Sequence, residues 1–391
     1  MDVFLLSAAR TPIGKFLGEL AEVPAPRLGA VVLAEAIKRA NVRPDQVDEV
    51  IMGNVVQAGV GQAPARQAAL AAGLPDTIAA YTVNKVCGSG LKAVMLGAQA
   101  IKAGDAEIVA AGGMESMSRA PYLVEGARQG LKYGDGKLVD ALIRDGLWCA
   151  FENCAMGDSA EYIAGKCSIT RSDQDRFSVQ SHRRATAAWE SGAFKAEVVP
   201  VTVGSGPKAK LVSKDEGIRV DSSTEGLAKL RPAFKVDGTV TAGNASQLSD
   251  GAAAVIVASE RAASRLSSKP LARIVSYATS GVAPKDIFIA PVSAVRMALD
   301  KARLTLNDIG LFELNEAFAA QMLACGNELG LDEDRVNVHG GAIALGHPIG
   351  ASGARVLVTL VHAMHHYGRR YGLASLCLGG GNAVAMVVER V

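Results

Sequence analysis

Short runs of apolar residues alternate along the chain with longer segments whose apolar positions recur at helical spacing. Apolar residues at positions i, i+3, i+4 and i+7 predict amphipathic helices, whereas short apolar runs bounded by turn residues predict buried strands. The pattern predicts helices over residues 27–40, 64–73 and 88–104, and strands over residues 3–8, 49–55 and 106–113. Strands that alternate with helices are typical of an α/β fold.

The longest uncharged run near the C-terminus covers residues 371–388, YGLASLCLGGGNAVAMVV. Its four glycines and its asparagine would be unfavourable in a membrane-spanning helix. Two short strands joined by a glycine-rich turn fit this composition better. The sequence therefore predicts a strand pair here and not a membrane segment.

Composition narrows the class of protein. The chain has 391 residues, of which 49% are hydrophobic, and a formal net charge of +2, which gives no electrostatic reason to expect nucleic acid binding. Its six cysteines are scattered without a paired CxxC spacing, which argues against a disulfide scaffold or zinc site and for a reducing compartment. The N-terminus, MDVFLLSAARTPIGKF, has no basic segment and predicts a first strand and a turn, not a signal peptide. We therefore expect a cytoplasmic protein.

The second half of the chain repeats the pattern of the first half. The segment AIKRANVRPDQV agrees with ALDKARLTLNDI as apolar, polar or small at most positions, at an offset of 262 (298 − 36). Continued along the chain, the comparison sets Gly53 opposite Asn315, Cys87 opposite His347, and Ala110 opposite Cys377. Such a repeat predicts two similar α/β domains whose matching turns meet at a shared interface, with chance similarity as the alternative. A polar, turn-rich segment from about residue 117 to 243 reads as an insertion in the first half.

Candidate chemistry begins with the stretch NKVCGSGLKAV, residues 84–94. Gly88 and Gly90 remove side chains near Cys87, which allows a sharp turn and the close approach of another molecule. The helical pattern that follows places Cys87 near a helix N-terminus, where the helix dipole and free N–H groups favour a thiolate. Cys87 is therefore a candidate nucleophile, and a buried structural cysteine beside a tight turn is the alternative.

Two further candidates lie in the second half. A cysteine nucleophile needs a base, and His347, within GGAIALGHPIGASGAR, titrates near neutrality. Cys377 ends an apolar run and precedes three glycines, whose N–H groups can stabilise a negative oxygen. A structural loop histidine and a core cysteine are the respective alternatives. The three histidines of HAMHHYGRRYG are interpreted as part of a solvated helix end, so we predict no metal site.

Taken together, these segments resemble the thiolase family from end to end of the chain. The motifs are AARTPIGKF, NKVCGSGLKAV, AGGMESMS, KLRPAF, GTVTAGNASQLSDGAAA, NEAFA, GGAIALGHPIGASGAR and LASLCLGGGN. The last two are very specific in combination. Within the family the chain is most similar to bacterial acetyl-CoA acetyltransferases and 3-ketoacyl-CoA thiolases.

The resemblance implies a thiolase fold: two similar βαβαβαββ domains in five α-β-α-β-α layers, with an inserted loop domain. The N-terminal domain would comprise residues 1–118 and 245–267, the inserted loop domain residues 119–244, and the C-terminal domain residues 268–391. The loop domain would bind coenzyme A. The resemblance also implies a homo-oligomer, expected to be a dimer of dimers, with APYLVEGARQGLKYGDGKLVD as a contact loop.

The implied reaction is the Claisen condensation of two acetyl-CoA molecules to acetoacetyl-CoA and CoA, or the reverse thiolysis of a 3-ketoacyl-CoA. Cys87 would be acylated while His347 takes its proton, and Cys377 would shuttle the proton at Cα of the second acyl-CoA. Asn315 would hold a water that forms one oxyanion hole with His347, and the N–H groups of Cys87 and Gly379 would form the other. Coenzyme A thioesters would be substrates, and we expect no metal or prosthetic group.

Coenzyme A contacts are implied in the same way. Ser246 would bond the pantetheine amide with Ala242 beside it, and Arg219 would lie at the nucleotide end. The pantetheine tunnel would be lined by Leu147, Met156, Phe234, Ala317 and Phe318. Ordinary core packing is the alternative for the apolar residues.

Two positions depart from the family pattern. Ala155 replaces a histidine that short-chain biosynthetic members usually carry, and Gly226 stands where many carry a serine near the adenine. The segment IAPV, residues 289–292, resembles acetoacetyl-CoA thiolases of the mitochondrial type. On balance the sequence favours short-chain substrates.

Three other functions compete with this interpretation. The first is a longer-chain 3-ketoacyl-CoA thiolase of β-oxidation. The second is a decarboxylating ketosynthase, which uses one cysteine and two histidines, so the second-half cysteine argues against it. The third is a non-catalytic acyl-CoA-binding protein on the same scaffold, which would be expected to lack Cys87, His347 or Cys377, and all three are present.

Overall fold

Every element predicted from the apolar pattern forms in the computed structural model, which describes residues 1–266 and 268–391. The strands are β1 (Val3–Arg10), β2 (Gly14–Lys15), β3 (Glu49–Gly53), β4 (Ala79–Val83), β5 (Ile108–Ser116), β6 (Tyr122–Val124), β7 (Leu138–Asp140), β8 (Trp148–Cys149), β9 (Cys154–Ala155), β10 (Val201–Val203), β11 (Lys210–Val212), β12 (Ser249–Ser259), β13 (Ala272–Gly281), β14 (Leu311–Leu314), β15 (Tyr371–Leu378) and β16 (Asn382–Arg390). The helices are α1 (Ala25–Arg39), α2 (Pro64–Ala71), α3 (Ser89–Ala103), α4 (Met156–Lys166), α5 (Arg171–Glu190), α6 (Thr224–Ala228), α7 (Glu260–Arg265), α8 (Ala290–Ala302), α9 (Ala319–Leu329), α10 (Ala342–Leu345) and α11 (Ile349–His366).

The apolar run at residues 371–388 forms the antiparallel pair β15 and β16, as predicted. Gly380 and Gly381 both have φ of +81° in the turn that joins the strands, a conformation that glycine adopts without a Cβ penalty. Among the described residues, none of the helices has the length and apolar character needed to cross a membrane.

One mixed sheet runs through the molecule in the order β14-β15-β16-β13-β1-β12-β5-β3-β4, with β2 on the side of β12. Within the first half, β3 is parallel to β4 and β5, and β12 is antiparallel to β5 and β1. Within the second half, β14 is parallel to β15, and β16 is antiparallel to β15 and β13. The halves thus share one arrangement, and they join where β1 pairs with β13. The position of β4 beside β3 is taken in the second half by a single bridge between Phe312 and Val336.

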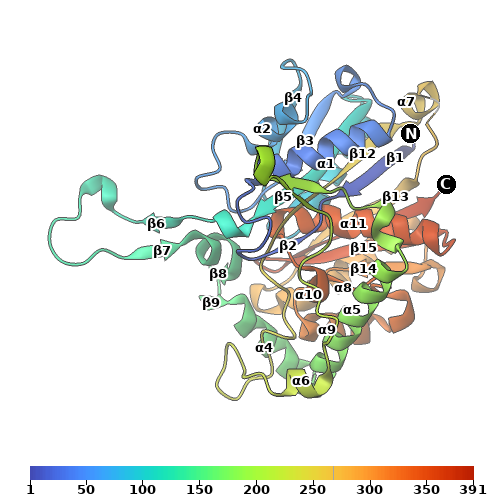
Figure 1. Cartoon of the computed structure of the whole chain (residues 1–391). Coiled ribbons are helices and arrows are strands. Elements are labelled where there is room, and N and C mark those ends of the chain that lie inside the picture. The colour runs from blue at the N-terminus through green and yellow to red at the C-terminus, as the bar shows by residue number, and fades with distance from the viewer. Residues whose placement is uncertain (267) are drawn as a thin grey trace.

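The helices form three layers around the two half-sheets (Figure 1). Helices α1 and α2 cover the outer face of the first half-sheet, and α8 covers the outer face of the second. Helices α3 and α11 lie between the half-sheets and pack against each other and against strands of both halves. Leu91 and Met95 of α3 are buried in the same core as Val356 and Leu360 of α11. The result is the predicted α-β-α-β-α order.

The contact between α3 and α11 shows the internal repeat directly. A Cβ added at Gly90 would lie 2.6 Å from the backbone nitrogen of Ala354, and a Cβ added at Gly353 would lie 2.3 Å from the backbone nitrogen of Leu91. The contact is reciprocal when each first-half residue corresponds to the residue 263 positions later (353 − 90 and 354 − 91). Such reciprocity is the property of a twofold interface.

This geometry corrects two of the pairings read from the sequence. Strand register agrees within one residue, because the first pairs of the two ladders, Glu49 with Val109 and Leu311 with Gly372, differ by 262 (311 − 49) and 263 (372 − 109). Cys87 therefore corresponds to Gly350 and not to His347, and Cys377 corresponds to Met114 and not to Ala110. The sequence comparison drifted because identity is low, whereas paired strands cannot slip without turning their side chains over.

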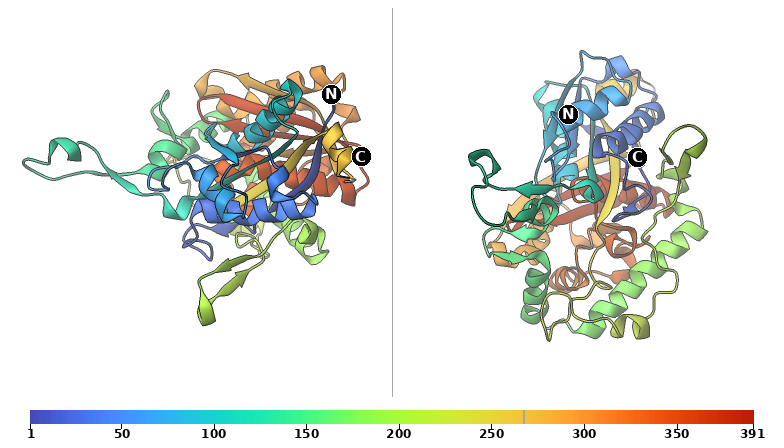
Figure 2. Two further views of the ribbon diagram at one scale, coloured as in Figure 1. Left: turned by 90° about the horizontal axis from the view of Figure 1, so that it is seen from above. Right: turned by 60° about the vertical axis from the view of Figure 1, so that its left-hand side comes forward.

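Between β5 and β12 the chain leaves the sheet for a long excursion that holds strands β6 to β11 and helices α4 to α6. The hairpin of β6 and β7 projects from the body in Figure 1 and again in the left view of Figure 2. Helices α4 and α5 pack instead on α9 of the second half. The excursion therefore reaches across to the half of the chain that carries His347 and Cys377.

Candidate active site

Cys87 lies in a tight turn between the end of β4 and the start of α3. A single bridge joins Lys85 to Cys87 across Val86, whose φ of +48° is unusual for a β-branched residue. The Ser89 hydroxyl donates to the Val86 carbonyl at 2.6 Å and accepts from the Lys85 N–H at 2.8 Å. Strain of this kind costs about 1–3 kcal/mol and persists where the surroundings fix it, commonly at functional sites. A valine residue does not by itself indicate a positive φ, so the sequence could not reveal this strained turn.

The glycines that flank Cys87 serve a different purpose from the one predicted. A Cβ at Gly88 would lie 2.5 Å from Cδ2 of Leu378, and a Cβ at Gly90 would meet the backbone of α11. Neither Gly88 nor Gly90 has a positive φ, so the backbone conformation does not require glycine at either position. These glycines let α3 approach the second half of the chain closely, and the space beside them is filled by protein and not left for a ligand.

The backbone amides of Cys87 and Gly379 lie near the Cys87 thiol, although these residues come from opposite halves. Both amides act to lower the pKa of the thiol. Burial nevertheless raises that pKa to about 12, so the amides oppose the shift only in part. The thiolate expected from the helix N-terminus is therefore not the form that the free protein favours, because desolvation outweighs the amides.

Cys377 is buried one residue before the end of β15, beside the turn that carries Gly379. Burial raises the pKa of its thiol well above the ordinary value, and a negative charge on Cys87 would raise it further, which places the two thiols near one another. Cys377 belongs to an apolar cluster with Ala317 and Phe318, and Met156 packs against the same cluster. The structure thus brings together the two predicted cysteines.

His347 lies in the loop between α10 and α11, and its side chain is buried. Its backbone N–H donates to the Gln247 carbonyl at 3.0 Å and lies 3.2 Å from the Ser249 hydroxyl, so the segment before β12 fixes the loop. The ring Nδ1 is 2.6 Å from the Ser352 hydroxyl, and the Asn315 amide nitrogen is 3.4 Å from both ring nitrogens. Burial, helped by Arg355, lowers the pKa of His347 to about 3, so the ring is a neutral proton acceptor.

A buried carboxylate that the sequence reasoning missed lies where the end of β5 meets the start of α11. Glu115, near the end of β5, accepts the N–H groups of Val55 at 3.0 Å, Val56 at 3.3 Å and Gly350 at 2.9 Å, and the Asn54 amide at 2.7 Å. Burial raises the pKa of Glu115 to about 8, whereas the backbone hydrogen bonds lower it. Four donors surround its two oxygens, which favours the carboxylate form. Its position in AGGMESMS was the signal, since an acid inside an apolar strand needs a buried partner.

The predicted coenzyme A residues fall into three groups. Met156, Ala317 and Phe318 gather around Cys377, and the Phe234 ring lies 6.3 Å from that of Phe318. Ser246 joins this group because its N–H donates to the Ala317 carbonyl at 3.0 Å.

The remaining three residues lie apart from that group. Leu147 packs against the apolar cluster that Cys87 also touches. Ala242 and Arg219 are exposed, and the N–H of Arg219 donates to Nδ1 of His182 on α5 at 3.1 Å. The structure therefore does not bring Arg219 to the cysteines.

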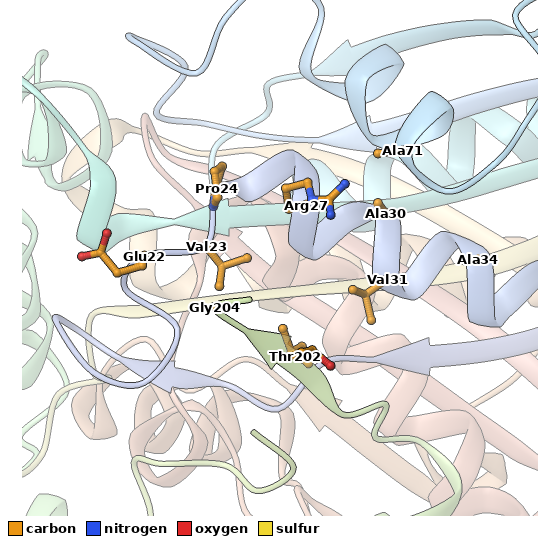
Figure 3. Close-up of a pocket in the computed structure, with 11 residues that line it drawn as sticks. Glu22, Val23, Pro24, Arg27, Ala30, Val31, Ala34, Ala71, Thr202 and Gly204 are labelled. Carbon is orange, nitrogen blue, oxygen red and sulfur yellow. The ribbon is translucent and has the colours of Figure 1, made fainter. Parts of the chain in front are cut away.

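A hollow of about 430 Å³ lies elsewhere, between α1, the end of α2 and the start of the β10–β11 hairpin (Figure 3). Glu22 and Arg27 lie at the edge of this hollow. Among the residues that the structure describes, none of the predicted site residues lines it. Within residues 1–266 and 268–391, no cluster of three or more histidine, cysteine or acidic side chains is suited to hold a metal. His362, expected to be solvated, instead contacts the Ala8 carbonyl at 3.1 Å, because α11 packs its inner face against β1.

Comparisons with known proteins agree along the whole chain. Family profiles described as thiolase, N-terminal domain, and thiolase, C-terminal domain, match residues 3–261 and 268–390. The acetyl-CoA acetyltransferase of Escherichia coli (strain K12) is 56% identical over 388 residues, which cover 99% of this chain and 98% of that protein. The probable acetyl-CoA acyltransferase of Staphylococcus aureus (strain N315) is 52% identical over 392 residues, which cover 99% of each. The crystal structure of the Bacillus anthracis acetyl-CoA acetyltransferase superposes with a TM-score of 0.98 at 45% identity and covers 100% of this chain and 99% of that one.

Proposed function

The chain belongs to the thiolase family, and on that premise we propose that it condenses two acetyl-CoA molecules reversibly to acetoacetyl-CoA and CoA through an acetyl group on Cys87. Relatives more than half identical over nearly the full chain are named acetyl-CoA acetyltransferase, which supports this substrate. The structural observation that carries the proposal is the position of the Cys87 thiol, beside the backbone amides of Cys87 and Gly379 and near the thiol of Cys377.

In the first step, His347 accepts the Cys87 proton as the sulfur attacks the carbonyl carbon of acetyl-CoA. Charge then develops on the carbonyl oxygen beside a sulfur already surrounded by the amides of Cys87 and Gly379, which are suited to stabilise it. The carbon–sulfur bond to CoA breaks, and CoA leaves as a thiol with the proton of Cys377. The products are acetyl-Cys87, a protonated His347 and a Cys377 thiolate.

In the second step, the Cys377 thiolate removes a proton from Cα of a second acetyl-CoA. The enolate oxygen is stabilised by protonated His347 and by a water held on Asn315, and the Cα carbanion attacks acetyl-Cys87. Acetoacetyl-CoA forms as the Cys87 sulfur leaves and recovers its proton from His347. All three residues then hold the protons with which they began.

Coenzyme A would lie over the group formed by Met156, Phe234, Ser246, Ala317 and Phe318, because this group borders Cys377. Leu147 would close the tunnel on the Cys87 side, and Ala242 and Arg219 would contact the outer part of the cofactor from the surface. The loop domain at residues 119–244 would supply most of these contacts. Residues 1–118 and 245–267 would form one thiolase domain, which supplies Ser246, and residues 268–391 the other, which supplies Ala317 and Phe318.

A short acyl group suits the packing around Cys377. Phe288 and Phe318 are both buried in the same cluster as Cys377, with ring centroids 5.2 Å apart and edge to face. Two rings packed edge to face form a rigid wall that would leave little room for a long chain. A longer-chain 3-ketoacyl-CoA thiolase remains the second candidate, because the Staphylococcus aureus relative is named acyltransferase.

We also propose a homo-oligomer in a reducing, cytoplasmic setting. Strand β4 ends the sheet, pairs on one side with β3, and exposes Tyr81, so that a second copy can continue the sheet. The projecting β6–β7 hairpin exposes Tyr122, Leu131 and Tyr133, which suits contact between dimers. Six free thiols support the reducing setting.

Mapping the acetyl group tests the function. The protein is incubated with acetyl-CoA, quenched in acid, digested, and its peptides weighed, and we expect the acetyl group on Cys87. Acetylation of another cysteine would overturn the assignment. Thiolysis rates on 3-ketoacyl-CoAs from C4 to C16 then decide chain length, and rates that rise with chain length would favour the second candidate.

A further inference from the structure

The Ser352 side chain stands between the His347 ring and the backbone. Its hydroxyl oxygen lies 2.6 Å from Nδ1 of His347 and 2.9 Å from the carbonyl oxygen of Pro348, one turn earlier in α11. Ser352 is fully buried. Both contacts are of hydrogen-bond length, so each needs a proton between its two heavy atoms.

The protons can be placed from these contacts alone. A carbonyl oxygen only accepts, so the single hydroxyl proton of Ser352 lies on the Pro348 side. The Ser352 oxygen must then accept a proton from Nδ1 of His347. The opposite choice, in which the hydroxyl donates to Nδ1, would leave two oxygens facing each other at 2.9 Å with no proton between them.

Asn315 is compatible with this assignment without selecting it, because a neutral histidine ring always has one lone-pair nitrogen and Asn315 is equally far from both ring nitrogens. Its amide nitrogen, which only donates, lies 3.4 Å from both ring nitrogens of His347. One of these nitrogens must hold a lone pair to accept from it. With the proton on Nδ1, that nitrogen is Nε2.

We propose that Ser352 is a positioning residue that holds neutral His347 as the Nδ1–H tautomer and keeps Nε2 free to accept the proton of Cys87. The proposal rests on the proposed role of His347 as the base. After the proton transfer, the new Nε2–H can donate to the enolate oxygen, which links the two steps of the reaction. In a comparable arrangement, a histidine base in the wrong tautomer loses several orders of magnitude in rate.

The tautomer can be measured directly in the free wild-type protein. Neutron diffraction, or nitrogen NMR of histidine-labelled protein with His347→Asn to assign the signal, should show the proton on Nδ1 and none on Nε2. A proton on Nε2 of the free protein would overturn the proposal. This measurement needs no turnover, so it decides the proposal even if the thiolase reaction itself were not found.

The kinetic test compares two buried serines with the same local geometry. We expect Ser352→Ala to lower the rate of Cys87 acetylation about 10²-fold with little change in KM for acetyl-CoA, because it loses part of a base's contribution. Ser178 on α5 is the matched control, since it is also buried and its hydroxyl donates to the carbonyl of Gln174 four residues earlier at 2.8 Å, with no histidine on its oxygen. Ser178→Ala should acetylate at the wild-type rate, and an unchanged rate in Ser352→Ala would contradict the proposal.

Discussion

Cys87 and Gly350 stand at matching places of the repeat, Cys87 two residues before α3 and Gly350 in the first turn of α11, yet they meet opposite groups. At the start of α11, Gly350 donates its N–H to the carboxylate of Glu115, which comes from the end of β5 in the first half. Just before α3, the thiol of Cys87 lies beside the N–H of Gly379, which follows the end of β15 in the second half. With the offset of 263, Glu115 corresponds to Leu378, the neighbour of Gly379.

The difference shows how one fold yields a structural site and a reactive site from equivalent places. At α11 the free N–H groups are occupied by a permanent acceptor, which satisfies them as buried donors require. At α3 the matching strand end supplies another donor, so the N–H groups converge on a thiol and remain available to a developing negative charge. The first arrangement should contribute to stability, and the second to catalysis.

Substitution at the two helix starts should separate these contributions, with the largest effect on chemistry. Cys87→Ala should lower condensation and thiolysis by about 10⁴-fold or more, because no nucleophile remains. It should change the free energy of unfolding by less than about 1 kcal/mol, because the substitution removes a single sulfur atom and the residue keeps part of its surface exposed although its thiol is desolvated. Acetyl transfer assays and urea unfolding measure the two quantities.

The equivalent change at α11 should behave in the opposite way. A Cβ at Gly350 would lie 2.7 Å from a carboxylate oxygen of Glu115 and 2.7 Å from the Met114 carbonyl oxygen, so Gly350→Ala should destabilise the protein by about 1–3 kcal/mol. If Gly350→Ala proved as stable as wild type, or Cys87→Ala strongly destabilised, the assignment of one structural and one reactive helix start would be wrong.

The two cysteines should also be separable. A positioned acid or base contributes about 10²- to 10⁴-fold, so Cys377→Ala should lower condensation and thiolysis by that factor while Cys87 is still acetylated. Cys377→Ser should fall between wild type and Cys377→Ala, because a hydroxyl keeps the geometry but is a poorer base. Buried Cys325, which donates to the Phe288 carbonyl and is not assigned a role in the reaction, offers the control Cys325→Ser. Loss of acetylation in Cys377→Ala, with exchange of the Cα proton of acetyl-CoA retained, would mean that the two roles are reversed.

Removing the carboxylate at α11 should have a smaller but clear effect on stability. Glu115→Ala leaves the N–H groups of Val55, Val56 and Gly350 without their acceptor. At about 1–3 kcal/mol for each buried unpaired group, with relaxation recovering part of the cost, we expect a loss of about 3 kcal/mol. Glu107, just before the same strand, is the control, because its pair with Arg261 is at the surface and should contribute at most about 1 kcal/mol. Equal unfolding midpoints for the two variants would refute the structural role of Glu115.

The sequence predicted the helices and strands better than it predicted the surroundings of the candidate site residues. Apolar periodicity located α1, α2, α3, β1, β3 and β5, because each buries one face or both. The pairing of Gly53 with Asn315 agrees within one residue with the register of β3 and β14. The resemblance supplied Cys87, Cys377 and His347 as candidates, and the structure places the two cysteine thiols near one another.

The remainder depended on contacts between residues far apart in the chain. Gly88 and Gly90 were interpreted as room for a ligand, but a local turn signal cannot reveal that Leu378 and Ala354 fill that space. The thiolate predicted for Cys87 followed from the helix start alone and omitted desolvation, which only tertiary burial determines. Glu115 was missed for the same reason, since three of its four donors lie about sixty residues earlier and the fourth 235 residues later.

The smallest expected effect is that of acidic pH on the rate of Cys87 acetylation. It tests whether burial beside α11 keeps His347 neutral. An exposed histidine with a pKa near 6.5 would be about 97% protonated at pH 5, which would lower acetylation of Cys87 about thirtyfold relative to pH 8. Burial and Arg355 lower the pKa of His347 to about 3, so the ring stays neutral over this range and the rate should change by less than about twofold.

The lowered pKa of His347 makes the fold less stable in acid. Between pH 6.5 and 3 the unfolded chain binds a proton on this histidine and the folded chain does not, so acid destabilises the fold across that window. Rates are therefore measured only where circular dichroism shows the folded protein, and His365→Gln, at the exposed end of the same helix, should leave the profile unchanged. A tenfold loss of acetylation with a midpoint near pH 6.5 would show that His347 titrates as an exposed residue and that the neutral-base mechanism is wrong.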